Sequence, residues 1–299
     1  MSEHATALLS EAPDSAAEAT APWGLAAAAD RHRLYERSVQ CPEAEVDFFA
    51  QRFEWLRGRP ARRLREDFCG TASVCCEWVG RHAHNRSVGV DLDASVLDWA
   101  RAHNLAALPQ SGAERVRLRQ ADVLAPGPGG HGDEERPDIV AAMNFSYWLF
   151  QDRATLRRYF ERVAAVLDDD GVFFLDAYGG YDAFRDIVEE RGIDDDEGRF
   201  TYVWEQSGYN PISGRMTCEI HFAFPDGSRL DRAFRYDWRL WTLPEIRELL
   251  AEAGFGRVIC YWQGWDESGE ADGVFEPAEQ ADADAGWICY ISAEKAPPD

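Results

Sequence analysis

The short stretch "REDFCGTASV" joins an apolar segment to a helical pattern and carries the residue types of a ligand-binding turn. Backbone N–H groups at a strand-to-helix turn point toward whatever binds there. A dinucleotide needs three glycines in such a turn so that the backbone can touch its pyrophosphate, but only Gly70 is present. Phe68 and Ala72 take the flanking glycine positions, and the carboxylates of Glu66 and Asp67 would repel a pyrophosphate. The chemistry of this turn therefore excludes dinucleotides.

The same acids suit a cationic ligand. S-adenosylmethionine has no phosphate and carries a sulfonium and an ammonium, which carboxylates attract. Asp91 ends the next apolar stretch, 25 residues after Glu66, where an acid accepts from ribose hydroxyls, and Asp122 ends the third, where it would accept from the adenine amino group. We expect the following residues to contact this cofactor: Glu66, Asp67, Cys69, Gly70, Thr71, Asp91, Leu92, Asp122, Val123 and Asn144.

Each acid also has a structural interpretation. Glu66 or Asp67 would cap the following helix, and Asp93 is a natural N-cap for the segment "ASVLDWAR". Three acids at three successive strand ends are nevertheless more specific for a ligand than any one of them.

The elements that must position these residues alternate along the chain. Five apolar segments between residues 62 and 180 alternate with helical patterns, which predicts a parallel sheet with helices on both faces. Strong period-2 alternation follows in "RFTYVWEQ", "RMTCEIHFAF" and "LDRAFRYDWRLW", and predicts an antiparallel addition with a hairpin turn at "FPDGSR". Thr242 and Glu245 form a capping box for a late helix, and two closing strands, "RVICYWQGW" and "GWICYIS", flank an acidic loop.

These patterns divide the chain into five parts. We expect a disordered tail (1–22), a helical cap (23–60), a cofactor-binding core (61–180), an antiparallel addition or substrate lid (181–241), and a C-terminal helix with the closing strands (242–299).

From about Arg62 to the C-terminus the chain resembles a class I S-adenosylmethionine-dependent methyltransferase. The segment "EDFCGTA" is similar to the first motif of that family, with Glu66 as its acid, and Asp91 and Asp122 match its ribose and adenine acids. The resemblance implies a Rossmann-like α/β fold with a seven-stranded, mostly parallel sheet, whose last strand, "GWICYIS", runs antiparallel. It also implies a methyl transfer by in-line displacement.

The acceptor site is less well marked. Asn144 and Tyr147, in "NFSYW", have the spacing of the Asn-Pro-Pro-Tyr motif of methyltransferases that act on amino groups, without its prolines. They are our candidate catalytic residues. Alternatively, Asn144 caps a turn while Phe145 and Trp148 fill the core, and the short motif by itself favours this second interpretation. Asp176 and Asp237 are candidate bases.

Aromatic residues near predicted strand ends would box a cationic or planar acceptor. The candidates are Tyr35, Tyr147, Trp148, Tyr178, Trp204, Trp238 and Trp241. Individually, such residues are more often part of a core.

Composition narrows the function further. The 299 residues carry a net charge of −23 with a single lysine, Lys295, which argues against nucleic acid as a partner. The charge serves either solubility or the attraction of cationic small molecules. The seven cysteines and seven histidines lack metal-ligand spacing, and no signal peptide or long apolar segment appears. We expect a cytoplasmic monomer or homodimer with no metal and no membrane contact.

Two alternatives to a small-molecule N- or O-methyltransferase stay open. One is a methyltransferase of RNA or protein, and the other is a non-catalytic module that binds S-adenosylmethionine.

Overall fold

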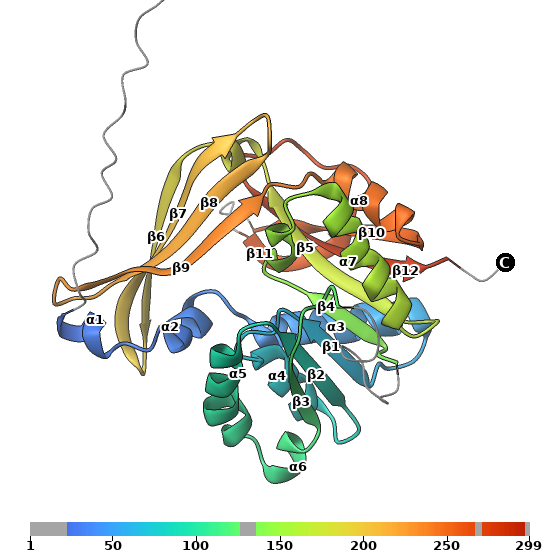
Figure 1. Cartoon of the computed structure of the whole chain (residues 1–299), viewed down its shortest axis with the longest axis horizontal. Helices are drawn as coiled ribbons and strands as arrows, with labels where there is room; N and C mark the ends of the chain where they lie inside the picture. The colour runs from blue at the N-terminus through green and yellow to red at the C-terminus, as the bar shows by residue number, and fades with distance from the viewer. Residues whose placement is uncertain (1–22, 126–135, 267–270, 297–299) are drawn as a thin grey trace, which may run out of the picture.

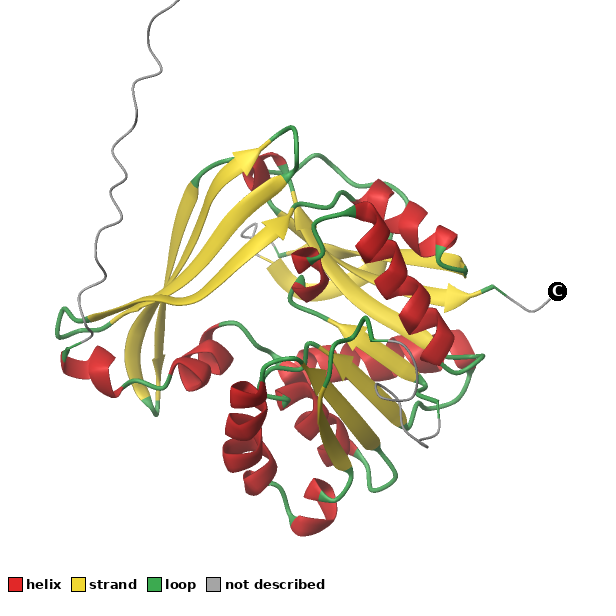
Figure 2. Ribbon diagram, in the orientation of Figure 1, coloured by secondary structure: helices red, strands yellow, loops and turns green. Residues whose placement is uncertain are grey.

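The computed structural model describes residues 23–125, 136–266 and 271–296, and two sheets dominate this part of the chain (Figures 1 and 2). The tail predicted for residues 1–22 lies outside the described residues. The larger sheet, here called the core sheet, has eight described strands in the order β11-β10-β12-β5-β4-β1-β2-β3. The smaller sheet has the order β6-β7-β8-β9 and is antiparallel throughout.

The strands of the core sheet are β1 (Arg63–Asp67), β2 (Arg86–Asp91), β3 (Val116–Gln120), β4 (Ile139–Ala142), β5 (Val172–Gly179), β10 (Phe255–Trp265), β11 (Ala271–Pro277) and β12 (Trp287–Lys295). The five from β1 to β5 are parallel, so their carboxyl ends meet at one edge. β12 pairs antiparallel with both β5 and β10, as expected for the closing strand. The predicted α/β class with a mostly parallel sheet is confirmed.

Helices cover both faces of the core sheet. The helices of the described residues, of both sheets together, are α1 (Gly24–Ala28), α2 (Arg31–Ser38), α3 (Pro42–Arg57), α4 (Ser73–Arg81), α5 (Ala94–Ala100), η1 (Arg101–Leu105), α6 (Gln110–Ala113), η3 (Ser146–Leu149), α7 (Arg153–Val166), η4 (Tyr181–Phe184) and α8 (Leu243–Glu252). Side chains of α3, α4 and α5 pack in one apolar cluster, and those of α7 and α8 pack in another with the opposite residues of β4 and β5. The capping box of Thr242 and Glu245 begins α8 as predicted.

The small sheet consists of β6 (Ile187–Asp195), β7 (Gly198–Asn210), β8 (Arg215–Ala223) and β9 (Arg229–Arg239). It follows β5 directly and stands beside the core sheet, with α1 and α2 against its far end (Figure 1). The antiparallel addition and its hairpin turn are as predicted: Gly227 has φ 83°, and Phe224 N donates to Ser228 O. The small sheet lies over the carboxyl ends of β4 and β5.

Two strands were not expected, and both lie at sheet edges. β11 falls in the acidic segment predicted to be a loop, so the described core sheet has eight strands instead of seven. β6 is exposed along most of its length. Neither strand alternates between apolar and polar residues, because neither has one face buried in a core, so the period-2 signal is absent.

The arginines of β1 are explained by their partners. Arg63 contacts the carboxylates of Asp138 and Asp168 at 2.9 and 2.7 Å, and Arg65 pairs with Asp67 at 2.6 Å. A central strand accepts these charges because acids from neighbouring loops and from the strand itself compensate them.

Among the described residues, no helix combines the length and apolarity that crossing a bilayer requires.

Candidate functional site

The turn between β1 and α4 keeps the backbone of a glycine-rich loop without its glycines. Phe68, Gly70 and Ala72 have φ angles of 58°, 51° and 57°, all in the left-handed region. The two non-glycine residues stand at the positions where the sequence motif has glycines, so the conformation is conserved although the residue type is not. A Cβ on Gly70 would meet no atom within 4 Å, so the loop faces open space at this position.

Asp91, at the end of β2, organises this turn. One carboxylate oxygen accepts from Gly70 N at 2.8 Å, and the other accepts from Asp93 N at 2.9 Å. Each oxygen therefore keeps a free lone pair with which to accept from a ligand hydroxyl. Asp93 is the N-cap of α5, as its alternative interpretation predicted.

The next strand adds a third acid. Asp122 is exposed just beyond β3 and accepts from Leu124 N at 2.8 Å, while Val123 is buried. Leu92, beside Asp91, is 69% exposed, which leaves an apolar surface next to both carboxylates. Because β1, β2 and β3 are adjacent and parallel, these residues share one edge of the sheet.

Asp67 is not part of this edge. Its side chain is buried, pairs with Arg65 Nε at 2.6 Å and accepts from the Tyr159 hydroxyl at 3.0 Å. The prediction that Asp67 contacts the cofactor must be corrected, because consecutive residues of a strand face opposite sides of the sheet. Asp67 lies on the side of α7, while Glu66 lies on the side of α4.

Glu66 is buried below the turn and accepts from Cys75 N at 3.1 Å, so it caps α4. Burial raises the pKa of Glu66 to about 8. Cys69 is also buried, and the Thr71 hydroxyl donates to Gln40 in the segment between α2 and α3. Glu66, Cys69 and Thr71 therefore support the turn through packing and hydrogen bonds. Glu66 and Cys69 are not on the side of the turn that faces open space at Gly70.

At the end of β4 the backbone forms a second left-handed turn. Asn144 and Phe145 have φ angles of 57° and 56°. Their N–H groups donate to the two oxygens of Asp176, at 2.8 and 2.9 Å. Asp176, on β5, is buried, and this burial raises its pKa to about 7. Asp176 thus holds a strained turn in place, which is a positioning role.

A cavity of about 880 Å³ lies against this turn. Its walls come from the carboxyl ends of β4 and β5, the inner face of the small sheet, the start of α3, and β12. Four of the aromatic residues proposed from the sequence as acceptor contacts line it: Tyr35, Tyr178, Trp204 and Trp238. Tyr202 and Tyr236 line it too and were missed, although the alternation of β7 and β9 was the available signal, since every second residue of each strand faces inward.

Three predicted acceptor contacts do not line the cavity. Tyr147 is fully buried, and its hydroxyl donates to the Asp176 carbonyl at 2.6 Å. Trp241 is buried, and its Nε1 donates to the Phe150 carbonyl at 3.1 Å. Trp148 stacks on Tyr178 with 4.8 Å between ring centroids and supports that ring from behind. All three are core residues: η3 turns Tyr147 and Trp148 inward, and Trp241 is buried in the segment between β9 and α8.

The charges of the cavity are mostly negative. Among the described residues that line it, the acids are Glu45, Asp176, Asp182, Glu189 and Glu190, and the one base is Arg191. The Arg191 guanidinium donates to the Ser38 carbonyl and lies over the Tyr202 ring at 5.5 Å. Asp237, the other candidate base, is on the outer face of the small sheet, where it contacts Thr217 and Arg235.

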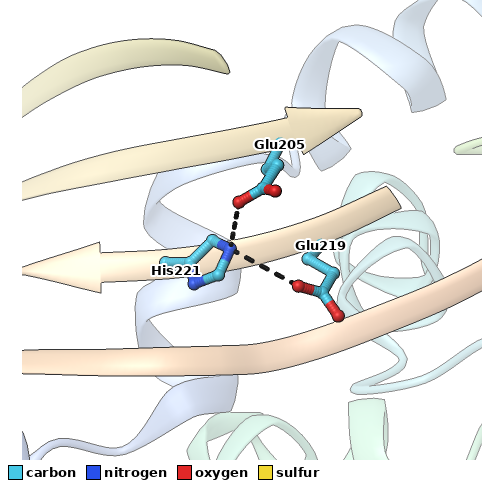
Figure 3. A group of neighbouring side chains, drawn as sticks. All are labelled: Glu205, Glu219 and His221. Carbon is cyan, nitrogen blue, oxygen red and sulfur yellow. Dashed lines mark ion pairs between the residues drawn. The ribbon is translucent and has the colours of Figure 1, made fainter. Parts of the chain in front are cut away.

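A histidine with two glutamates forms a further cluster on the outer face of the small sheet (Figure 3). His221 Nε2 lies 3.4 Å from Glu205 and 3.9 Å from Glu219. However, His221 Nδ1 accepts from the backbone N–H of Arg232 at 3.1 Å. Glu219 is already paired with Arg232 and Arg235, at 3.2 and 2.8 Å. With one glutamate neutralised by two arginines, the group is better described as an ion-paired cluster than as a metal site.

The structure is similar to several solved methyltransferases. DesVI from Streptomyces venezuelae matches with a TM-score of 0.64 at 18% identity, over 89% of this chain and 96% of that one. CalS10, an amino pentose methyltransferase from Micromonospora echinaspora, matches at 0.62 and 17%, over 88% and 96%. KedS8, a sugar N-methyltransferase from Streptoalloteichus, matches at 0.59 and 18%, over 99% of both chains.

No family model and no curated protein matches the sequence. At these identities the structural likeness establishes the fold. The chain has the fold of class I S-adenosylmethionine-dependent methyltransferases, as the sequence motifs predict.

Proposed function

We propose that the protein is an S-adenosylmethionine-dependent methyltransferase that methylates an amino group of a small molecule. The observation that carries this proposal is the acidic, aromatic cavity at the ends of β4 and β5, next to a strand-edge site whose exposed groups are carboxylates and an apolar side chain. Carboxylates and aromatic rings together favour a compact cation.

The residues of the first three strand ends fit S-adenosylmethionine. Asp91 has free lone pairs for the ribose hydroxyls, Asp122 is exposed for the adenine amino group, and Leu92 offers an apolar surface for the ring. Gly70 leaves room for close approach. When bound there, this cofactor would supply a methyl group activated by its sulfonium.

The chain itself would bind and orient the acceptor. Asn144 lines the cavity, and its backbone is fixed by Asp176, which holds its side chain at the cavity wall beside Glu45, whereas the Tyr147 hydroxyl is occupied and supports β5. The Tyr178 ring, with Trp148 stacked behind it, forms one wall. Alignment of an acceptor with the donor supplies most of the rate enhancement of such transfers.

The solved relatives support an amino sugar as the acceptor class. CalS10 is described as an amino pentose methyltransferase and KedS8 as a sugar N-methyltransferase, and both match over most of this chain. The acids that line the cavity disfavour a phosphate-bearing acceptor, including RNA, because they outnumber the one arginine among its described residues.

Calorimetry with S-adenosylhomocysteine and an assay for its release test the proposal. The acceptor panel consists of methyl glycosides of amino pentoses and amino hexoses, each paired with the corresponding hydroxyl sugar. We expect binding of S-adenosylhomocysteine and its release with amino sugars only. Binding without release from any acceptor would favour a non-catalytic module, and release with the hydroxyl sugars alone would identify an O-methyltransferase.

Asp91→Ala tests the cofactor site. Removal of this carboxylate loses the bond that fixes Gly70 and the acceptor of the ribose hydroxyls, so we expect S-adenosylhomocysteine to bind about 30- to 100-fold more weakly, a loss of about 2 to 3 kcal/mol. Asp98→Ala is the matched control, since Asp98 is exposed on α5 and contacts Arg101. Equal affinities for the two variants would place the cofactor elsewhere.

A further inference from the structure

Glu45 is a buried carboxylate that lines the cavity and that neither the sequence motifs nor the fold assign to a task. It lies in the first turn of α3 and is 5% exposed. Within the part of the chain that the structure describes, its Oε2 has no hydrogen-bond partner. A buried carboxylate oxygen without a partner costs free energy, so a protein retains one where a ligand will supply the partner.

The surroundings of Glu45 select the charge of that ligand. Asn144 hydrogen-bonds its side chain, and the carboxylates of Glu66 and Asp176 are close enough to oppose its ionisation. Burial, reinforced by these two acids, raises the pKa of Glu45 well above its usual range. A positively charged or hydrogen-donating group beside Glu45 would relieve this unfavourable arrangement, whereas an anion would worsen it.

The position of Glu45 relates it to the acceptor more than to the cofactor. The cavity that it lines also contains Asn144, Asp176 and Tyr178, and does not include Gly70, Asp91 or Asp122. Tyr35, Tyr178 and Tyr290 line the same cavity, so an acceptor ring has aromatic walls near Glu45. Glu45 therefore faces the space in which the atom to be methylated would lie.

We propose that Glu45 binds the amino group of the acceptor and accepts its proton during methyl transfer, an inference that rests on the proposed function. The neutral amine donates an N–H to the Glu45 carboxylate and directs its lone pair toward the methyl group. The N–C bond forms as the S–C bond breaks, and its electron pair stays on sulfur. The proton passes from nitrogen to Glu45, which leaves a neutral N-methylamine, and Glu45 then releases the proton to solvent.

This role explains why Asp176 is not the base. Both oxygens of Asp176 accept from the turn at Asn144 and Phe145, and protonation of Asp176 would weaken the turn that positions Asn144. Glu45 has the oxygen that is free, and its raised pKa makes its deprotonated form a stronger base than an ordinary carboxylate.

Glu45→Gln tests the inference, because the amide keeps the shape and removes the basic oxygen. Glu43→Gln is the matched control, since Glu43 is exposed two residues earlier in the same helical turn. With an amino pentose glycoside that the wild type methylates, we expect kcat to fall by at least about 100-fold in Glu45→Gln. The acidic limb of its pH–rate profile should lose the contribution of Glu45 and keep only that of the acceptor amine, while the affinity for S-adenosylhomocysteine stays within twofold.

A second measurement keeps the inference testable if no acceptor turns over. Calorimetry with the amino pentose glycoside, in the presence of S-adenosylhomocysteine, should show binding to the wild type and to Glu43→Gln and at least tenfold weaker binding to Glu45→Gln. Unchanged amine affinity, or turnover of Glu45→Gln within threefold of the wild type, would overturn the role of Glu45. A selective loss of S-adenosylhomocysteine affinity would also overturn it and assign Glu45 to the cofactor. Absence of release by the wild type would contradict the proposed function.

Discussion

The two halves of the ligand edge hold their carboxylates in different ways. At the ends of β2 and β3, Asp91 and Asp122 are tied to N–H groups within the same edge and remain accessible. At the ends of β4 and β5, Asp176 and Glu45 are buried and their pKa values are raised, and they come from segments about 130 residues apart. The first half is thus a rigid, solvated binding edge, and the second is a desolvated pocket suited to moving a proton.

Burial at this edge also serves the fold alone, as β1 demonstrates. Glu66 and Asp67 are adjacent, yet one caps α4 and the other neutralises Arg65. Acids that would contact a ligand must therefore be distinguished from acids that stabilise the fold. The following variants test that distinction.

Asp67→Asn should cause the largest loss of stability. Arg65 and Asp67 have side chains that are 5% and 0% exposed, and loss of the Asp67 charge leaves the guanidinium without this buried partner. We expect the free energy of unfolding, measured by urea denaturation, to fall by about 3 kcal/mol. In the absence of urea, where the variant is folded, its affinity for S-adenosylhomocysteine should match that of the wild type. A loss of affinity that exceeds the one in Asp91→Ala would return Asp67 to the cofactor site.

Glu66→Gln should stabilise the fold, and the size of this effect depends on pH. The pKa of Glu66 rises from its usual value of 4.5 to about 8 on folding, because burial disfavours the charged form. Between these values the folded state keeps a proton that the unfolded state releases, so the free energy of unfolding falls as pH rises from about 4.5 to about 8 and then levels off. A glutamine at this position does not titrate, and its carbonyl can still accept from Cys75 N.

We therefore expect Glu66→Gln to match the wild type at pH 4.5 and to be more stable at pH 8.5 in urea denaturation, by up to about 5 kcal/mol for the full pKa shift. Glu43→Gln, the control for loss of one exposed carboxylate, should show no such gain. Equal destabilisation by Glu66→Gln at both pH values would mean that Glu66 is ionised in the folded state. In that case burial would not raise the pKa of this acid of β1, unlike those of Asp176 and Glu45.

Sequence reasoning placed the acids at the strand ends better than the residues that line the cavity, for a physical reason. Asp91 and Asp122 follow their strands directly, so the register of the sheet fixes their place. Glu45 could not be found in this way, because it is on a helix before the first strand and reaches the cavity only through the packing of α3. Tyr147 was assigned to the acceptor because a motif gives spacing but not the direction in which η3 turns a side chain.

The same distinction applies to the fold. Strands with one buried face, such as β7, were predicted from their alternation, whereas the exposed edge strands β6 and β11 have no such pattern. The adjacent acids of β1 carried a signal that was overlooked: two neighbours in a strand cannot both face one turn.

Ala72→Gly should have the smallest effect and tests how the turn tolerates its missing glycines. Ala72 is fully buried with φ 57°, a conformation that costs an alanine about 1 to 2 kcal/mol. Glycine removes this strain, but it also loses a buried methyl group and makes the unfolded chain more flexible, so we expect a net change of less than about 1 kcal/mol. Ala100→Gly is the matched control, because Ala100 is equally buried but has φ −55°. It should cost about 1 to 2 kcal/mol more than Ala72→Gly in urea denaturation. Equal losses of unfolding free energy in the two variants would show that the left-handed conformation of Ala72 is not strained.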